Sequence, residues 1–348
     1  MKKVIAILVC MVMAASLFTG CSTKDTSTAV ETATATVAAA AGGAVAPKSG
    51  SKFTIGLSMI DMVIPFYVTI QARVAEICKD KGYELITLNA QGDSNKQIAD
   101  MEDLVTQKCD VILCNSFDTK ILTETINRLK DEGTPVIAID NALDAEAKVL
   151  TCVQANNYGN GFAVGQWIAK QMKGTPIKIA LLSGEMGTIN SLDRRDGLLN
   201  GIIEEQLASE GTANVQIIAQ GYCKGWAEDA AVTAMEDIIS LNEDFNVLMS
   251  EADVMTMAAM KVLDEKGMLD GKLIASAADG QKEAFEMIKA GKYGATGLNS
   301  PKLIGDLAMD VATRYFAGET DFPSKTYTTA ACVTIDNVDQ YYDPNSSF

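Results

Sequence analysis

From residue 53 onward, short apolar runs rich in β-branched residues alternate with longer segments whose apolar positions recur at helical spacing. This alternation is typical of a parallel β-sheet covered by helices on both faces. The predicted strands are 53–58, 83–88, 110–114, 135–139, 149–154, 177–182, 214–219, 246–249, 272–276, 293–298 and 331–335. The predicted helices are 65–81, 94–107, 118–131, 158–172, 191–209, 226–240, 254–266, 281–290 and 301–317. Because the pattern restarts with the strand at 149, the sequence predicts two successive α/β units.

The ends of two predicted helices carry local signals. Gly82 and Gly133 stand where left-handed residues commonly end helices. Asp118 is placed to cap the start of the helix predicted at 118–131.

Polar side chains stand where several predicted strands end. Ligands of open parallel sheets bind beyond the carboxyl ends of the strands. Ser58, Asn115 and Asp140 end three runs in the first half, and Asp279 and Asn299 end later ones. Groups that accept or donate in pairs suit the hydroxyls of a sugar, so we expect these side chains to contact one. A local turn or cap is the alternative for Asp140 and Asn115, and a structural role is the alternative for Ser58.

Two aromatic residues, Phe66 and Tyr67, open the helix that Pro65 begins. Aromatic residues at such positions usually belong to the core. Consecutive residues on a helix point in different directions, however, so both cannot face inward. We therefore expect at least one of them to offer a ring to the apolar face of a ligand.

Composition favours a binding protein over an enzyme. The formal net charge of −16 argues against nucleic acid or anionic lipid as a partner, because both require a basic face. The chain has no histidine, which removes the commonest general base and metal ligand. Glycine-rich phosphate loops, a nucleophile elbow and CxxC spacing are also missing. We expect no cofactor and no metal.

The first 51 residues predict export and attachment. Two lysines and an apolar run too short for a comfortable membrane span precede small residues and Cys21. Residues 17–21 resemble the lipobox of bacterial lipoproteins, in which the cysteine is lipidated; an ordinary signal peptide is the alternative. Residues 22–51 are rich in Thr, Ala, Ser and Gly, which predicts a flexible tether. The reach of such a tether is on the order of 30 Å.

Six cysteines remain after Cys21. Their even number in an exported chain permits disulfides, but most lie in or beside apolar runs, which favours buried thiols. They are Cys78, Cys109, Cys114, Cys152, Cys223 and Cys332.

A set of short motifs extends from about residue 52 to 342. In order, they are Ile55-Gly56-Leu57-Ser58, Pro65-Phe66-Tyr67, Asn89-Ala90-Gln91-Gly92-Asp93, Cys114-Asn115, Asp140, Asn156-Asn157, Asp193-Arg194, Trp226, Asp253-Val254-Met255 and Asp279-Gly280. Their order and spacing resemble the ribose- and galactose-binding type of periplasmic binding protein (type 1). That resemblance implies two similar Rossmann-like lobes with parallel sheets, joined by a three-crossing hinge, that close around a sugar.

The resemblance also implies where the lobes divide and which further residues bind. We place the crossings near Asn156, Leu298 and Thr328. The N-terminal lobe is then 52–156 plus 299–328, and the C-terminal lobe is 157–298 plus 329–348. Trp226 matches the second-lobe aromatic of the family, and Arg194 lies near its sugar-binding arginine, although a solvated helix position is the alternative for Arg194.

The chain departs from the ribose binders at several positions. Asn141 follows Asp140 where they carry an arginine, Ala278 replaces an aromatic, and Glu251 stands beside Ala252 where an asparagine is usual. We include Asn141 and Glu251 among the expected contacts. The changed polarity favours a larger pyranose, a polyol or a derivative over ribose.

The sequence thus predicts a monomeric substrate-binding lipoprotein on the outer face of the cytoplasmic membrane. It would deliver a monosaccharide or polyol to the transmembrane subunits of an ABC permease. A sensor that presents a sugar or furanosyl signal to a membrane receptor is the main alternative. A sugar-responsive repressor would need a helix-turn-helix that is not evident here; an exported enzyme and a structural role are the remaining alternatives.

Asp140 is the residue on which we expect binding to depend most. Its removal should weaken binding by at least about a hundredfold. Ligand-free stability should change little if the carboxylate is hydrated in an open cleft.

Overall fold

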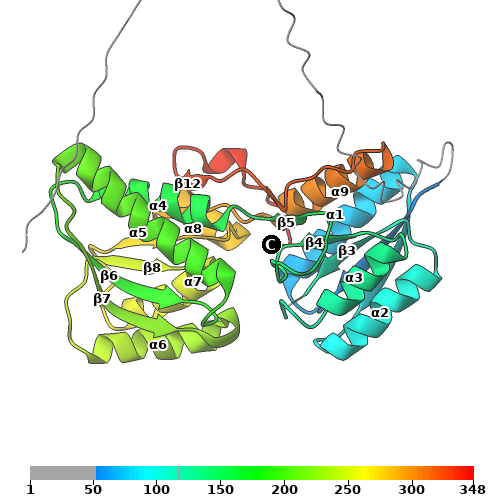
Figure 1. Ribbon diagram of the computed structural model, residues 1–348. Helices are drawn as coiled ribbons and strands as arrows, with labels where there is room; N and C mark the ends of the chain where they lie inside the picture. Colours follow the sequence, from blue (N-terminus) through cyan, green and yellow to red (C-terminus); the bar gives the residue numbers. More distant parts are fainter. Residues whose placement is uncertain (1–51, 117) are drawn as a thin grey trace, which may run out of the picture. The chain divides into compact units, whose positions relative to one another are not determined.

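The computed structural model describes residues 52–116 and 118–348, which form two lobes, each built on a six-stranded sheet (Figure 1). All strand pairs in the first sheet are parallel, and in the second only β10 and β12 are antiparallel. The first sheet has the order β11 (Lys325–Tyr327), β5 (Cys152–Gln154), β4 (Val136–Ile139), β3 (Val111–Asn115), β1 (Thr54–Met59), β2 (Glu84–Asn89). The second has the order β12 (Cys332–Thr334), β10 (Ala295–Gly297), β9 (Leu273–Ser276), β8 (Val247–Ser250), β6 (Ile177–Ser183), β7 (Val215–Tyr222).

Helices cover both faces of each sheet, as the alternating pattern predicts. In the first lobe, α1 (Pro65–Lys81) and α9 (Pro301–Phe316) share one core with β1, and α2 (Ser94–Thr106) and α3 (Thr123–Asp131) cover the opposite face (Figure 1). In the second lobe, α4 (Asn157–Gln171) and α5 (Ile189–Glu210) cover one face; α6 (Glu228–Ser240), α7 (Asp253–Glu265) and α8 (Lys282–Lys289) cover the other.

Glycines let α4 and α5 pack backbone against backbone. Gly161 and Gly165 on α4 face Gly197 and Gly201 on α5, each pair separated by one helical turn. A Cβ on Gly165 would lie 2.2 Å from the carbonyl oxygen of Leu198. This distance is a steric clash, so only glycine fits at this position. The close approach brings the first turns of both helices together, so that Asn157 of α4 bonds to Asn190 and Arg194 of α5, which line the cavity described below.

Two predicted helix starts lie in turns that precede the helix. The helix predicted from residue 118 begins at Thr123, because the Asp118 carboxylate accepts hydrogen bonds from the amides of Lys120 and Ile121 in a preceding turn. The helix predicted from Trp226 begins at Glu228, after a separate 3₁₀ turn. Gly82 does end α1, at φ +71°.

Three segments lead from elements of one sheet to elements of the other: the residues between β5 and α4, between β10 and α9, and between β11 and β12. They coincide with the crossings predicted near Asn156, Leu298 and Thr328, which supports the lobe boundaries that we propose. The strand β11 has no counterpart among the predicted elements, because only three residues form it and two of them are exposed.

The six cysteines after Cys21 are free thiols, five of them buried.

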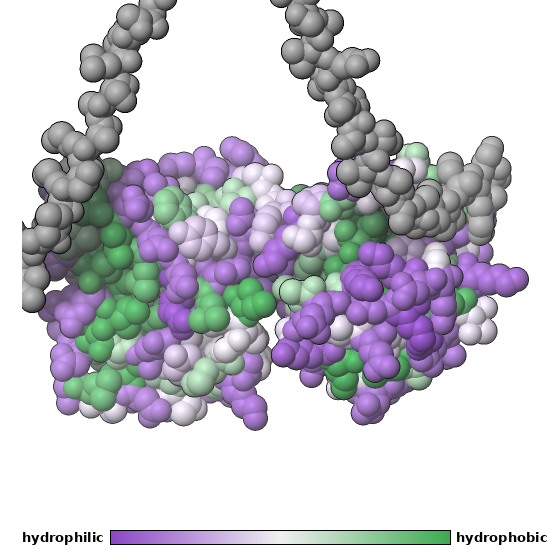
Figure 2. Space-filling view, viewed as in Figure 1, coloured by the Kyte–Doolittle hydropathy of each residue, from purple (hydrophilic) through white to green (hydrophobic). Residues whose placement is uncertain are grey.

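No helix among the described residues is long and apolar enough to cross a membrane. Figure 2 shows hydrophilic residues spread over the face in view, interrupted by small apolar patches. Cys21 and the predicted tether lie outside the described residues.

Candidate functional site

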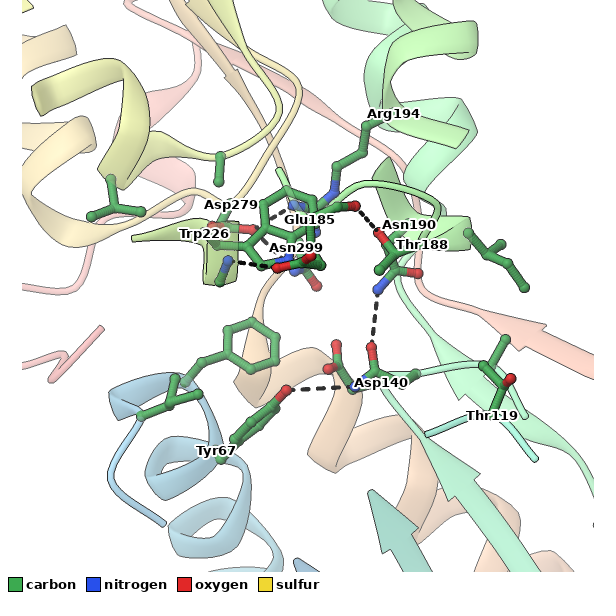
Figure 3. A pocket seen from close by; sticks show the side chains of 18 of the residues that line it. Tyr67, Thr119, Asp140, Glu185, Thr188, Asn190, Arg194, Trp226, Asp279 and Asn299 are labelled. Carbon is green, nitrogen blue, oxygen red and sulfur yellow. Dashed lines mark hydrogen bonds and ion pairs between the residues drawn. The ribbon is translucent and has the colours of Figure 1, made fainter. Parts of the chain in front are cut away.

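A cavity of about 1030 Å³ is lined by residues of both lobes. Most of the side chains selected from the sequence reach it from strand ends or helix starts. They are Phe66, Tyr67, Asp140, Asn141, Arg194, Trp226, Asp279 and Asn299. Figure 3 shows Tyr67 and Asp140 on one side and Arg194 and Trp226 on the other.

Asp140 follows β4 in a left-handed conformation, at φ +68°. Its amide donates to the carbonyl of Val153 at 2.8 Å, so the neighbouring strand fixes the turn. The residue is only 8% exposed, and burial raises the pKa of its carboxyl group to about 7; Arg194 opposes this rise and Asp279 adds to it. The expectation of a freely hydrated carboxylate is therefore wrong.

A chain of amide side chains joins the two lobes. The Nδ2 of Asn141 donates to the hydroxyl of Tyr67 at 3.5 Å, while its Oδ1 accepts from Nδ2 of Asn190 on α5 at 3.1 Å (Figure 3). Asn190 in turn accepts from Nδ2 of Asn157 at 3.2 Å. Asn141 thus contributes to the site by a neutral contact across the cavity.

Arg194 is held rigidly on the second-lobe side. Its Nε donates to Oδ1 of Asn157 at 2.8 Å, and its Nη1 donates to the backbone carbonyl of Glu251 at 2.8 Å. Nη1 also lies 3.3 Å from Oδ1 of Asp279, and the guanidinium lies 5.1 Å from the centre of the Trp226 ring. The residue is 4% exposed, so the solvated alternative is wrong. Pairing with Arg194 opposes the rise in the pKa of Asp279 that burial causes.

Aromatic rings stand on both sides of the cavity. Trp226 packs against Gly184, where a Cβ would lie 2.2 Å from the ring, so a larger residue at this position would displace the ring. On the first lobe, the rings of Phe66 and Tyr67 are edge to face at 5.8 Å. Both line the cavity, so the helix start offers two rings there.

Two buried acceptors at the cavity have no partner among the described residues. Asn299 donates through Nδ2 to Asp279 at 3.1 Å, but its Oδ1 is unpaired, as is Oε1 of Gln281. Buried polar atoms are nearly always hydrogen-bonded, so each unpaired acceptor requires a donor from a ligand or water.

The buried Asp253 carboxylate holds the loop that carries Asp279 and Gln281. Its Oδ2 accepts from the amides of Gly280 at 2.7 Å and Gln281 at 2.9 Å. Its Oδ1 accepts from the hydroxyls of Tyr293 and Thr296, both at 2.7 Å. Four hydrogen bonds to one buried carboxylate fix this part of the wall before any ligand arrives.

The structure does not place Ser58, Asn115 and Glu251 on the cavity wall. Ser58 is fully buried and accepts from Gln97 at 3.2 Å, and Gln97 also donates to the carbonyl of Asn115 at 2.6 Å. Glu251 accepts from the amide of Gly184 at 2.8 Å and from the hydroxyl of Ser191. The Nδ2 of Asn115 donates to the carbonyl of Ile139 at 3.4 Å. All three side chains are fully buried inside the lobes and do not line the cavity.

Other wall residues were not selected from the sequence. Asn190 stands in the first turn of α5, after β6, and Gln281 stands in the loop after β9, so an inspection of the segments that follow strands could have found them. No sequence pattern pointed to Phe348 as a cavity residue, because it lies far in sequence from every strand end that contributes to the cavity.

Comparisons with known proteins agree with this architecture. The family model described as periplasmic binding protein domain matches residues 55–320. The ribose import binding protein of Bacillus subtilis strain 168 is 29% identical over 273 residues, covering 78% of this chain and 85% of the relative. An ABC transporter solute binding protein of Mycobacterium smegmatis with bound glycerol is 28% identical, with a TM-score of 0.72 over 85% of this chain and 99% of that one.

A solute binding protein of Actinobacillus succinogenes 130z with bound D-allose has a TM-score of 0.74 at 22% identity, covering 83% of this chain and 100% of that one. These matches confirm the predicted two-lobed α/β fold. They are solute-binding proteins and not enzymes, which confirms the inference from composition.

Proposed function

Since the chain belongs to the periplasmic binding protein domain family, we propose that it is an extracytoplasmic substrate-binding lipoprotein of an ABC importer. It binds a monosaccharide or related polyol between its lobes and presents it to the transmembrane subunits. The names of its relatives support this class of ligand, because they include a ribose import binding protein and solute binding proteins that hold D-allose or glycerol.

The observation that carries the proposal is the distribution of polar groups around the cavity. Asp140 and Asp279 supply carboxylate acceptors, Arg194 supplies donors, and Asn299 and Gln281 supply unpaired acceptors. Aromatic rings from both lobes complete the lining. A ring of hydroxyls with an apolar C–H face satisfies such a wall, and no covalent chemistry is required.

Ribose itself is not the ligand that the polar groups favour. The neutral Asn141 bonds across the cavity to Asn190, in the place where the resembled ribose binders carry an arginine. The cavity of about 1030 Å³ leaves room for a larger molecule than a pentose. A pyranose, a cyclitol or a longer polyol fits the arrangement better.

The binding proposal predicts that one member of a sugar and polyol panel stabilises the protein. Thermal unfolding would be followed with D-ribose, D-allose, myo-inositol, xylitol and glycerol. A ligand present at 100 times its Kd adds about 2.7 kcal/mol to the unfolding free energy. If no member raised Tm at millimolar concentration, the assignment to this ligand class would be abandoned.

The anchor proposal predicts that Cys21→Ala yields an exported but unlipidated protein. The lipid is attached through the cysteine thiol, so alanine leaves nothing to modify. Fractionation should find the parent in the membrane pellet and the variant in the soluble extracytoplasmic fraction. Cys10→Ala, in the apolar run of the signal, is the matched control and should behave like the parent. Retention of Cys21→Ala in washed membranes would contradict the proposal.

A further inference from the structure

The segment from Val338 to Phe348 begins in the second lobe and ends against the first. Val338 is buried in the second-lobe core, and the hydroxyl of Tyr342 donates to Glu286 on α8 at 3.0 Å. Asp343 then pairs with Lys302 in the first turn of α9 at 2.7 Å. The chain therefore passes beside the hinge after leaving the second lobe.

A compact turn directs the last residues back toward the cavity. Asp343 accepts from the amide of Asn345 at 2.9 Å through its side chain, and from the amide of Ser346 at 3.0 Å through its carbonyl. The hydroxyl of Ser346 donates to the carbonyl of Phe348 at 2.7 Å. These local bonds fix the direction in which the final residue points.

The end of this segment contacts α1 of the first lobe. The hydroxyls of Ser347 and Thr69 are 3.1 Å apart. The ring of Phe348 meets the ring of Phe66 edge to face, at 5.1 Å between centroids and 83° between planes. Both rings line the cavity of about 1030 Å³. Phe348 therefore lines the cavity although it belongs to the segment 338–348 and does not follow a strand end.

We propose that Phe348 is a specificity-determining residue that packs, together with Phe66, against the apolar face of a cyclic ligand. The inference rests on the proposed function and deepens it. The carboxylates and amides of the cavity can form hydrogen bonds with the hydroxyls of a ligand. An aromatic ring packs against the C–H groups of a ligand and cannot supply such a hydrogen bond. A wall with both kinds of group favours a ring-shaped polyol with a continuous C–H patch over a short open-chain polyol.

Calorimetry with two cyclic probes, D-allose and myo-inositol, and one short probe, glycerol, tests this role. The probe to follow is the cyclic one that the parent binds more tightly. Phe348→Ala should raise the Kd of that probe about tenfold, because stacking and apolar burial are lost together. Glycerol should change by less than about twofold. Phe348→Leu should fall between the parent and the alanine variant. Asn345→Ala is the matched control, since this residue is exposed and, within 52–116 and 118–348, only its backbone amide is hydrogen-bonded.

The outcomes separate this inference from the proposed function. If the parent binds a cyclic probe and both Phe348 variants bind it within twofold of the parent, the role of Phe348 is overturned and the proposed function stands. If neither these probes nor D-ribose or xylitol bind the parent, the proposed function fails and the inference falls with it. Equal weakening of glycerol and the cyclic probe would also overturn the selectivity.

A second measurement tests the placement of the segment without any ligand. The full chain carrying Thr69→Cys and Ser347→Cys should form an intramolecular disulfide under mild oxidation, because the two hydroxyls are 3.1 Å apart. Thr69→Cys combined with Asn345→Cys is the control pair and should cross-link much less. Absence of the first cross-link would overturn the proposal, because Phe348 would not be held at the cavity.

Discussion

Asp140→Ala is expected to weaken binding of the tightest sugar or polyol probe by at least about a hundredfold. The carboxylate stands at the end of β4, faces the cavity and is 8% exposed, so water replaces a lost partner poorly. Hydrogen bonds to charged groups contribute about 1.5–3 kcal/mol each, and a carboxylate can accept from two neighbouring hydroxyls. A loss of about 2.7 kcal/mol corresponds to a hundredfold change in Kd.

Calorimetry on the folded variants measures the effect. Asp140→Asn keeps the shape and one acceptor, so it should lie between the parent and the alanine variant. Asp103→Asn, on the exposed face of α2, removes a carboxylate away from the cavity and should leave Kd unchanged. An affinity of Asp140→Ala within about threefold of the parent would mean that the ligand is held elsewhere.

Without ligand, Asp140→Asn is expected to become progressively more stable than the parent as pH rises from about 4 to 7. Burial raises the pKa of the Asp140 carboxyl group from 3.8 to about 7 in the folded chain. Between these two values the folded protein holds a proton that the unfolded chain releases. The unfolding free energy of the parent therefore falls with rising pH, by about 1.4 kcal/mol per pH unit. Asparagine does not titrate, so the variant escapes this loss.

Urea unfolding of both proteins at pH 4.5, 6 and 8 measures the difference. Its total change should be on the order of 3–4 kcal/mol. Other titrating groups are present in both proteins, so they largely cancel in the comparison. Asp103→Asn serves again as the control and should run parallel to the parent. A difference between Asp140→Asn and parent that stays constant with pH would show that the carboxylate is hydrated in the folded chain.

Asp140 illustrates how far the strand-end rule reaches. Because parallel strands place their carboxyl ends along one edge, Asp140, Asp279 and Asn299 could be selected without knowing any distance. The same rule selected Ser58 and Asn115, yet the hydroxyl of Ser58 accepts from Gln97 and the Nδ2 of Asn115 donates to the carbonyl of Ile139, both inside the lobe. A strand end fixes where a residue lies but not whether a neighbour has already taken its hydrogen bonds.

Local signals had a similar limit. Asp118 has the residue type of a helix cap, but its carboxylate closes a turn before α3. Pro65 and Gly82 do mark the two ends of α1, because the ring of proline and the absence of a Cβ act on the backbone directly.

The alternation of strands and helices, the two α/β units and most of the polar residues at the cavity could be predicted from the sequence, because periodicity and strand order act through local geometry. The remaining features depend on tertiary packing. The bridge from Asn141 to Asn190 joins residues on different lobes, and Phe348 reaches Phe66 across almost the whole length of the chain. The burial that raises the pKa of Asp140 likewise comes from packing by distant segments. No local pattern encodes such contacts, since each depends on how separately folded elements meet in space.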